Sequence, residues 1–489
     1  MVRSLGSAFV GAVLLSAPLG AQVPVSAAAL SRHIDAVFAA GAAAGMSVAV
    51  VHGDSILVVR ALGVADASTG RRVTESTRFL TASTTKALTA LTAVILDEQG
   101  VVDLDATLAQ LLPGAELDSS LSPREITLRD LLAMRHGIGQ DGPVVMRTAY
   151  TGEFDRPTLL RLLRHHGPSR AGRNFEYGNL GYNVAGLVLE TKAGAPWQDL
   201  VTRSVLQPLG MRETVSRISA VPARALAMPH AMEGGRLQRV PLYKSDRTMH
   251  AAGGHLTTAR DLARFVIAHL NQGKARGAPG VSAAAIAETH RRHIDQNRDF
   301  SFLHRNGWGL GLDIGDYRGD TVYQRPGSFT GYYSHMSFMP SRRVGIVVLT
   351  NGGIGGGGAA AEAVVQGVYD LFRGDSAAVA LARADSLAAT VRSRGTAAPA
   401  EPPPAPHPAE RYIGTYHDDQ LGTLVVERRR DSLVVRMGDA WGVASGQAGA
   451  PNALSASLMG SRRRLDFELG ATGSANSVTM GGRTFRRVR

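Results

Sequence analysis

The segment Ser83-Thr84-Thr85-Lys86, followed by the apolar stretch Ala87 to Leu96, constrains the fold of this 489-residue chain more than any other part of it. Such a stretch predicts a buried helix, and residues at positions i and i+3 lie on one face of a helix. The Lys86 nitrogen can therefore reach the Ser83 hydroxyl. Burial lowers the pKa of a lysine, so that its neutral amine can accept a proton. The pattern predicts a serine nucleophile activated by a lysine, at a helix N-terminus that favours negative charge developing on an acyl centre.

Strand patterns flank a mainly helical middle part of the chain. A helix at Leu30–Ala40 precedes a predicted hairpin that turns at Gly53-Asp54. The hairpin strands are Met46–His52 and Ser55–Leu62. From Phe79 to about His293 helix-spaced apolar residues dominate, and the clearest helices are Leu128–Met134, Thr158–Leu163, Tyr182–Thr191 and Ala259–Leu270. The later predicted elements are strands at Val322–Gln324, Tyr333–Met339 and Val344–Thr350 and a helix at Ala359–Phe372.

This order of elements predicts an α/β (α+β) layered domain at residues 22–393. We expect an antiparallel sheet with flanking helices, divided by an all-helical insertion, with a cleft between the two parts. The Pro-rich residues 394–409 then predict a stiff linker. Residues 410–489 alternate short strands with Gly and Asn turns, which predicts a small all-β barrel domain.

The first 21 residues predict a secretory signal peptide. They combine Arg3, an apolar run from Ala8 to Leu15 and a small residue, Ala21, before the expected mature start at Gln22. An uncleaved anchor and a disordered tail are weaker interpretations, because the apolar run is too short to span a bilayer comfortably. We therefore expect a periplasmic or secreted protein with no stable membrane span.

The composition excludes several classes of function. The chain contains no cysteine, which excludes thiolate catalysis, cysteine-bound metal and lipid attachment near the processing site. The formal net charge is +12, yet only four residues are lysines. The arginines cluster late in the chain, at Arg428–Arg430, at Arg462–Arg464 and at Arg486, Arg487 and Arg489. These clusters belong either to solvated strand faces or to a patch that binds an anionic envelope polymer, and we expect no nucleic-acid partner.

Two further patterns give no reason to expect a metal or a cofactor. Histidines occur as His165-His166, His250 with His255 and His290 with His293, but no carboxylate spacing such as His-Glu-x-x-His accompanies them. We expect these to be surface or core histidines. Gly352–Gly358 lacks the Lys-Ser or Lys-Thr of a phosphate loop and predicts a flexible turn.

Several motifs together resemble the serine β-lactamase and penicillin-binding protein superfamily, specifically its class C branch. They run through residues 30 to 372, with the barrel domain appended. The segments that carry the resemblance are Phe79–Lys86, Gln99–Asp105, Ile126–Leu132, Phe175–Tyr182, Pro208–Met211 and Ala252–Leu262. The resemblance implies a serine hydrolase.

The same resemblance implies roles for individual residues. Ser83 would attack the acyl carbonyl, and Lys86 would act with Tyr177 as the proton-transfer pair. Because the pKa of tyrosine is near 10, Tyr177 needs a neighbouring ammonium group to serve as a base at neutral pH. Asn179 would hydrogen-bond the substrate amide. The backbone N–H groups of Ser83 and Ser328 would form the oxyanion hole, where losing one donor costs about a hundredfold in rate.

The third motif of the family falls at Arg325-Pro326-Gly327, which departs from the usual Lys-Thr-Gly or His-x-Gly. Proline is tolerated on edge strands, and the arginine fork suits carboxylates. The resemblance therefore implies that Arg325 and Gly327 bind the substrate, with Arg325 on a carboxylate. Relatives often carry Thr-Ser-Gly where this chain has Arg135-His136-Gly137, to which we assign no role.

The sequence leaves more than one function open. Taken singly, Ser83 could cap a helix, Lys86 could lie along apolar surface, and Tyr177 and Asn179 could belong to an ordinary turn. Their order and context favour an exported serine hydrolase that forms an acyl-enzyme on Ser83. It would cleave a small molecule or short peptide, either a D-alanyl peptide, a β-lactam or a carboxylic ester. The alternative is a catalytically silent envelope protein that binds a peptidoglycan fragment; an α/β-hydrolase is disfavoured because no Gly-x-Ser-x-Gly occurs.

Overall fold

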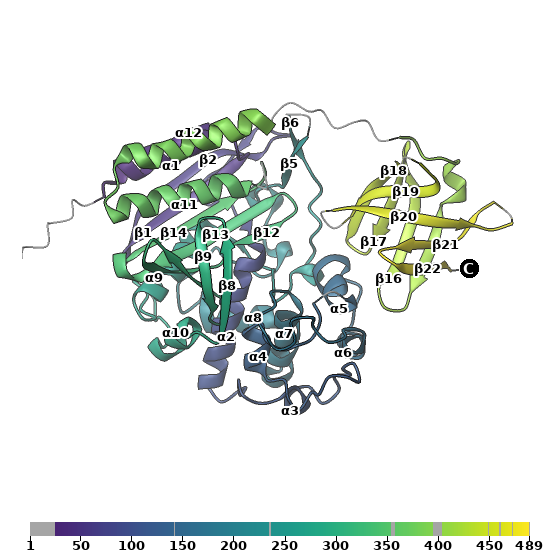
Figure 1. Cartoon of the computed structure of the whole chain (residues 1–489), viewed down its shortest axis with the longest axis horizontal. Helices are drawn as coiled ribbons and strands as arrows, with labels where there is room; N and C mark the ends of the chain where they lie inside the picture. The colour runs from purple at the N-terminus through teal and green to yellow at the C-terminus, as the bar shows by residue number, and fades with distance from the viewer. Residues whose placement is uncertain are drawn as a thin grey trace, which may run out of the picture.

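The computed structural model describes residues 25–140, 142–233, 236–353, 357–394, 403–447, 449–458, 461–471 and 473–488. The predicted signal peptide at residues 1–21 lies outside these ranges, as do residues 395–402 of the predicted linker. Within the described ranges, no helix is both long and apolar enough to cross a membrane. A large α/β domain is followed along the chain by a closed β-barrel (Figure 1).

An antiparallel sheet forms the centre of the large domain, as predicted. Its strand order is β3-β2-β1-β14-β13-β11-β10-β9-β8, and β12 pairs with β13. The strands are β1 (Gly45–His52), β2 (Ser55–Asp66), β3 (Arg71–Arg72), β8 (Ile294–Phe300), β9 (Leu303–Trp308), β10 (Asp313–Tyr317), β11 (Asp320–Gln324), β12 (Gly327–Phe329), β13 (Tyr332–Met339) and β14 (Val344–Thr350). The register of β1 on β14 runs from Met46 opposite Thr350 to His52 opposite Val344. The sheet therefore joins the two ends of the large domain's sequence.

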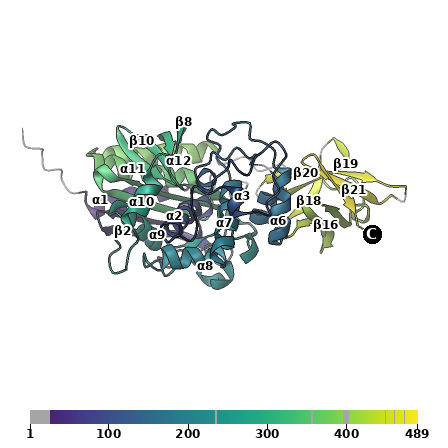
Figure 2. The same ribbon diagram turned by 90° about the horizontal axis from the view of Figure 1, so that it is seen from below.

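Helices cover both faces of this sheet (Figures 1 and 2). One layer consists of α1 (Ala27–Ala39), α11 (Gly358–Arg373) and α12 (Ala377–Arg394), which pack on one another over β14. On the other face α9 (Ala259–Leu270) packs on β1 and β14, and α10 (Ala283–His290) packs on the helical insertion. The sequence did not predict α12 or strands β8 to β10. In β8 the exposed side chains are mostly charged, so no alternating apolar pattern marks this strand.

The insertion lies between β4 (Phe79–Leu80) and β7 (Leu256–Thr257), which pair with each other. Its helices are α2 (Thr85–Glu98), α3 (Leu108–Leu111), α4 (Leu128–Leu132), α5 (Pro143–Met146), α6 (Arg156–Leu162), α7 (Leu180–Ala193) and α8 (Trp197–Val201). The prediction of an all-helical insertion is wrong in one place, because β5 (His230–Glu233) and β6 (Arg236–Arg239) form a two-stranded sheet. These strands lack β-branched and aromatic residues, so only their backbone pairing reveals them.

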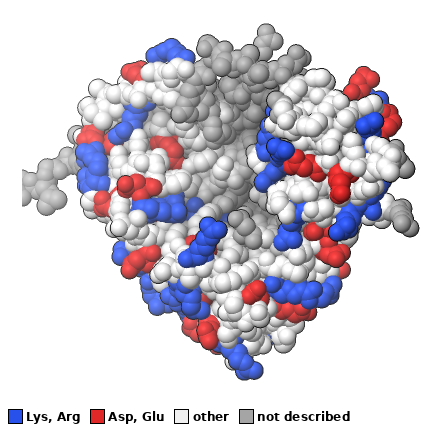
Figure 3. All heavy atoms as spheres, turned by 45° about the vertical axis from the view of Figure 1, so that its right-hand side comes forward, with Lys and Arg blue, Asp and Glu red and all other residues white. Residues whose placement is uncertain are grey.

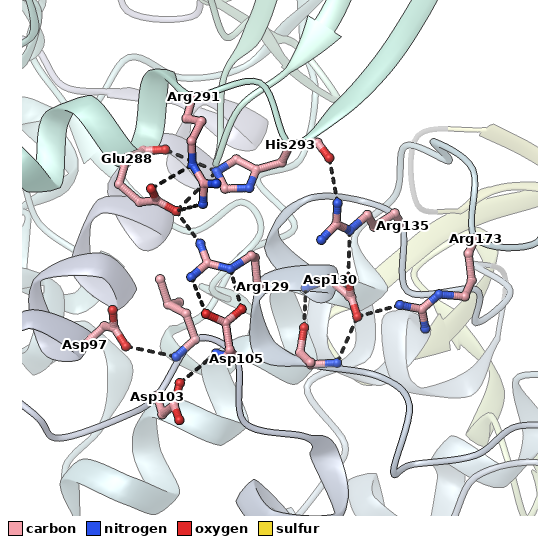
Figure 4. Close-up of polar contacts among 12 residues, drawn as sticks. Asp97, Asp103, Asp105, Arg129, Asp130, Arg135, Arg173, Glu288, Arg291 and His293 are labelled. Atoms are coloured by element: carbon pink, nitrogen blue, oxygen red, sulfur yellow. Dashed lines mark hydrogen bonds and ion pairs between the residues drawn. The ribbon is translucent and has the colours of Figure 1, made fainter.

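Charged side chains fix α4 within the insertion (Figure 4). The Thr127 and Asp130 side chains and backbones cap the helix reciprocally, with both hydrogen bonds at 3.1 Å. Buried Asp130 also accepts hydrogen bonds from Arg135 and Arg173, each at 2.7 Å. Arg135 further donates to the backbone oxygen of His293 at 2.7 Å. Arg135 therefore ties the helical part to the start of β8, a structural role that the sequence did not suggest.

Arg129 makes a second set of links from α4 (Figure 4). Its guanidinium donates to both carboxylate oxygens of Asp105, at 2.6 and 2.7 Å, and also to Glu288 of α10. Two of the segments that carry the family resemblance, Gln99–Asp105 and Ile126–Leu132, are thus held together by ion pairs. These ion pairs stabilise the insertion.

The C-terminal domain is a closed barrel of eight antiparallel strands, which confirms the predicted β-barrel. The strands are β15 (Gly414–Asp418), β16 (Gly422–Arg429), β17 (Ser432–Met437), β18 (Ala440–Gln447), β19 (Ala450–Leu458), β20 (Ser461–Leu469), β21 (Ala475–Met480) and β22 (Arg483–Arg487). Inward-facing side chains such as Tyr416, Val435 and Phe485 are fully buried and fill its interior. Met146 and Tyr150 of the insertion pack against this barrel core. The barrel therefore lies directly against the helical part of the large domain.

Candidate active site

Ser83 lies where the chain turns from β4 into α2. It occupies a 3₁₀ turn, Ala82–Thr84, and the helix that follows is buried from Thr85 to Leu96, as predicted. Ala82 has a left-handed backbone, with φ of 45°. This conformation is uncommon for a residue with a side chain and costs about 1–3 kcal/mol. The Thr84 hydroxyl donates to the Arg325 backbone oxygen at 2.9 Å, which fastens the turn to the segment of the third motif.

Lys86 joins the separate parts of the site. Its side chain is fully buried. The Nζ atom donates to Ser83 Oγ at 3.1 Å, to Asn179 Oδ1 at 2.8 Å and to the Ala252 backbone oxygen at 2.9 Å. A neutral amine has two N–H donors and one lone pair, so it can keep the last two bonds while accepting the hydrogen bond of the Ser83 hydroxyl. The Asn179 amide nitrogen remains able to donate to a substrate carbonyl.

The surroundings change the pKa values of Lys86 and Tyr177. Burial is the main cause of the lowered pKa of Lys86; the charge of Arg325 adds to this effect, and Tyr177 opposes it. Burial alone would raise the pKa of Tyr177, but the charges of Arg325 and Lys86 and hydrogen bonds with Ser83 and Lys86 lower it to about 8. The pKa values of both groups therefore lie below those of free lysine and tyrosine. The protons belong to the pair, so either residue can receive the proton of Ser83.

Arg325 is not directed toward open space. Its side chain is 4% exposed, and Nη1 lies 3.2 Å from Oδ2 of fully buried Asp313. The guanidinium lies over the rings of Tyr177 and Trp308. This environment argues against the predicted role of Arg325 in holding a substrate carboxylate, because its charge is already paired. The sequence could not reveal the pairing, which arises only when β10 and β11 lie side by side in the sheet.

The strand β12 brings the rest of the third motif to Ser83. A side chain at Gly327 would place its Cβ 2.1 Å from the Thr81 backbone oxygen and 2.7 Å from the Ser83 nitrogen, so only glycine fits this approach. Ser328 is exposed, and it lines a small cavity together with Ser83 and Asn179. The structure thus brings Ser83, Ser328 and Asn179 to one opening. The use of the two serine N–H groups as an oxyanion hole stays a prediction.

A larger cavity of about 710 Å³ also opens on Ser83. Tyr177, Gly178 and Asn179 line it, together with residues that belong to no predicted motif. One of these is Gln140, whose Oε1 accepts a hydrogen bond from the Leu180 nitrogen at 3.2 Å and whose side chain packs directly on Gly178, where an added Cβ would force it to move. A nitrogen of His136 lies 3.0 Å from the Gln140 amide nitrogen. His136, to which we assigned no role, therefore positions a side chain of the cavity wall.

Lys244 is a second lysine near Ser83, at a position that no sequence motif indicated. Its Nζ donates to the backbone oxygens of Ala149 and Thr248, at 2.9 and 3.0 Å, and lies 4.4 Å from the Phe329 ring centroid. Burial lowers the pKa of Lys244 to about 7, an effect that Asp439 partly opposes. The sequence did offer one signal for Lys244: lysine is rare in this chain, which has only four.

The paired histidines take part in internal hydrogen bonds. His250 Nδ1 lies 2.8 Å from Asn183 Oδ1, His255 Nδ1 lies 2.9 Å from Ser216 Oγ, and His293 Nε2 lies 3.2 Å from the Glu288 oxygen. Among the residues that the structure describes, no group of three or more His, Asp or Glu side chains is arranged to hold a metal ion.

The Beta-lactamase family model matches residues 30–371 of the sequence. The chain belongs to the Beta-lactamase family. The matched residues begin in α1 and end in α11, so they span the sheet, the insertion and the Ser83 site. This confirms the predicted resemblance to the serine β-lactamase and penicillin-binding protein superfamily, whose members are serine hydrolases.

Individual relatives of this Beta-lactamase family member are distant. Penicillin-binding protein 4 of Amycolatopsis lactamdurans is 29% identical over 304 residues, which are 60% of this chain and 77% of that protein. Protein flp of Staphylococcus aureus (strain NCTC 8325 / PS 47) is 22% identical over 314 residues, which are 63% of this chain and 59% of that protein. The chain thus spans 59% of the length of Protein flp, which is less than two thirds.

Solved structures share the fold of this Beta-lactamase family member. The octameric penicillin-binding protein homologue from Pyrococcus abyssi has a TM-score of 0.60 at 19% identity, covering 94% of this chain and 99% of its own. The D-amino acid amidase from Ochrobactrum anthropi SV3 has a TM-score of 0.59 at 20% identity, covering 70% of this chain and 98% of its own. At these identities the likeness shows the fold alone.

Proposed function

We propose that this protein is an exported serine hydrolase that forms an acyl-enzyme on Ser83 and cleaves an amide or ester. One observation carries the proposal: Ser83 Oγ lies 3.1 Å from the Nζ of fully buried Lys86, beside Tyr177. A binding protein has no need of a nucleophile next to a buried amine, since burying that amine is costly.

The reaction would proceed in two steps. Ser83 Oγ attacks the acyl carbonyl, and its proton passes to Lys86 or to the Tyr177 phenolate. Backbone N–H groups of Ser83 and Ser328 stabilise the oxyanion. The bond to the leaving nitrogen or oxygen then breaks, and the leaving group takes the proton. Water attacks the resulting ester and gives a proton to the same pair. The bond between the acyl carbon and Ser83 Oγ then breaks, and the pair returns the proton to Oγ, so that Ser83 is regenerated.

The substrate class within this reaction stays broad. The relatives include a protein named penicillin-binding protein 4 and a D-amino acid amidase. We propose a small molecule or short peptide as substrate, with a D-alanyl peptide, a β-lactam and a carboxylic ester as the candidates. In place of substrate binding, we propose that Arg325 positions Tyr177 and sets its charge, because Arg325 is buried beside that ring.

Mass spectrometry of the intact protein tests the proposal, after incubation with a fluorescent penicillin and, separately, with an activated ester. A stable penicillin adduct on Ser83, absent from Ser83→Ala, would support a penicillin-binding peptidase. Ester turnover without such an adduct would support an esterase. If the folded protein reacts with neither reagent, the proposal fails, and the silent peptidoglycan-binding alternative takes its place.

Export and polymer binding are separate proposals. Cleavage near Gln22 would give a mature protein whose N-terminal sequence and mass can be measured in a periplasmic or culture fraction. Binding of an anionic polymer by the arginine clusters has less support, since Arg428, Arg429 and Arg464 each pair with a carboxylate of the barrel domain. Exchanging the clustered arginines for glutamine should abolish salt-sensitive binding to envelope preparations if the patch is real.

A further inference from the structure

The cavity that opens on Ser83 has walls from both domains. On one side lie residues of the large domain, including Tyr150, Tyr177 and Asn179. On the other side lie barrel residues: Leu421, Arg463, Met480, Gly481 and Arg483. At about 710 Å³ the cavity is within the range of sites for small ligands, roughly 300–1,000 Å³. The barrel therefore forms part of the wall of the cavity that contains Ser83.

Specific contacts hold the barrel in this position. Buried Arg147 of the insertion donates to the backbone oxygens of Gln420 and Asp419, at 2.7 and 3.0 Å. The Asp439 nitrogen donates to the Thr151 backbone oxygen at 3.0 Å. One of these contacts joins two backbones, and the others join the buried Arg147 guanidinium to the barrel backbone. They fix the position of the barrel wall relative to Ser83.

The barrel wall brings two arginine side chains to the cavity. Arg463 lies in β20 and Arg483 begins β22. Among the described residues, neither guanidinium forms a hydrogen bond or an ion pair, and none of the described residues that line the cavity is Asp or Glu. In Figure 3, Lys and Arg side chains border the hollow between the large domain and the barrel, with Asp and Glu side chains beside them. Two arginines that line one cavity and form no ion pair with the described residues favour an anion there.

We propose that Arg463 and Arg483 bind a carboxylate of the substrate at a point away from the bond that is cleaved. This inference rests on the proposed function and narrows its substrate class to acidic acyl compounds or peptides. It also assigns to the barrel the carboxylate-binding role that the sequence placed on Arg325. Arginine suits this role because its fork can hold both oxygens of a carboxylate.

Paired substrates test this subsite in the full-length protein. We would compare p-nitrophenyl butyrate with the p-nitrophenyl monoester of glutaric acid, and a neutral thioester with one that carries a carboxylate on its leaving group. In Arg463→Gln/Arg483→Gln, kcat/KM for at least one acidic substrate should fall 10-fold to 100-fold, while values for its neutral partner stay within twofold. The control Arg276→Gln/Arg411→Gln removes the same charge at exposed positions outside the cavity and should leave both values unchanged.

Binding to Ser83→Ala, measured calorimetrically with the same acidic compounds, separates this inference from the proposed function. If the wild type hydrolyses nothing, the proposed function fails, yet weaker binding of both acidic compounds after loss of the two arginines would still support the subsite. Equal effects on acidic and neutral compounds, or no effect on either, would overturn it. Should the double variant fail to fold, Arg463→Lys/Arg483→Lys provides the comparison, with an intermediate loss expected.

Discussion

The guanidinium carbon of Arg325 lies 4.8 Å from the centroid of the Tyr177 ring. On its other side Arg325 pairs with Asp313, which is fully buried and also lies 3.4 Å from Arg305. A permanent charge at this distance favours the phenolate form of Tyr177. The relationship places Arg325 beside the proposed proton-transfer pair, where its charge acts on Tyr177 and its side chain is 4% exposed.

Removal of the positive charge of Arg325 should raise the pKa of Tyr177. With a neutral ester, kcat/KM of the wild type should rise with pH through an apparent pKa of about 8, because the basic form of the pair accepts the Ser83 proton. In Arg325→Met we expect this limb to move to higher pH by about one unit or more. Arg325→Lys, which keeps a positive charge, should have a pH profile close to that of the wild type. An unchanged profile in a folded Arg325→Met variant would contradict the role.

Lys86→Met should abolish acylation while the protein stays folded. The methionine fills similar space but cannot accept or donate a proton, so kcat/KM should fall about a thousandfold or more. Mass spectrometry should show no penicillin adduct, and an unchanged circular dichroism spectrum should show that the variant is folded. Lys192→Met, at an exposed position away from the site, is the control. Activity within tenfold of the wild type would rule out Lys86 as part of the proton path.

Gly327→Ala should disrupt the site by steric clash alone. Its Cβ would meet the Thr81 oxygen at 2.1 Å and the Ser83 nitrogen at 2.7 Å, which forces β12 away from the nucleophile. We expect kcat/KM to fall about a hundredfold, because a displacement of about 1 Å is enough for such a loss. Gly167→Ala, whose Cβ would meet no atom within 4 Å, should leave the rate unchanged. Similar rates in both variants would show that β12 adapts to the added atom.

Arg147→Met should weaken the attachment of the barrel. It removes the hydrogen bonds to Gln420 and Asp419 and one at 2.8 Å to the Glu153 oxygen. Leaving a buried carbonyl without a partner costs about 1–3 kcal/mol. We expect a lower thermal unfolding temperature and, because Arg463 and Arg483 lose their fixed place, a higher KM for acidic substrates. Exposed Arg161→Met should change stability by less than about 0.5 kcal/mol; an equal loss in the two variants would contradict the docking role.

The sequence alone determined the local features of this protein. The spacing of Ser83 and Lys86, the apolar run of α2, the hairpin at Gly53-Asp54 and the strand β14 are all encoded within short stretches, and the structure has them where the patterns predicted them. Helix and strand periodicity are local properties, which explains this success. The same holds for the barrel, since its strands alternate with turn residues.

The tertiary structure decided what the charged residues near the site do. Arg325 became an internal partner of Asp313, and His136 became a support for Gln140. Arg463 and Arg483 reached the Ser83 cavity only because the barrel docks on the insertion. Burial and the approach of distant segments set the partner of each charge, and no residue spacing along the chain records either of them. The proposed nucleophile can therefore be recognised from the local sequence, whereas the proposed recognition of a substrate depends on packing between the two domains.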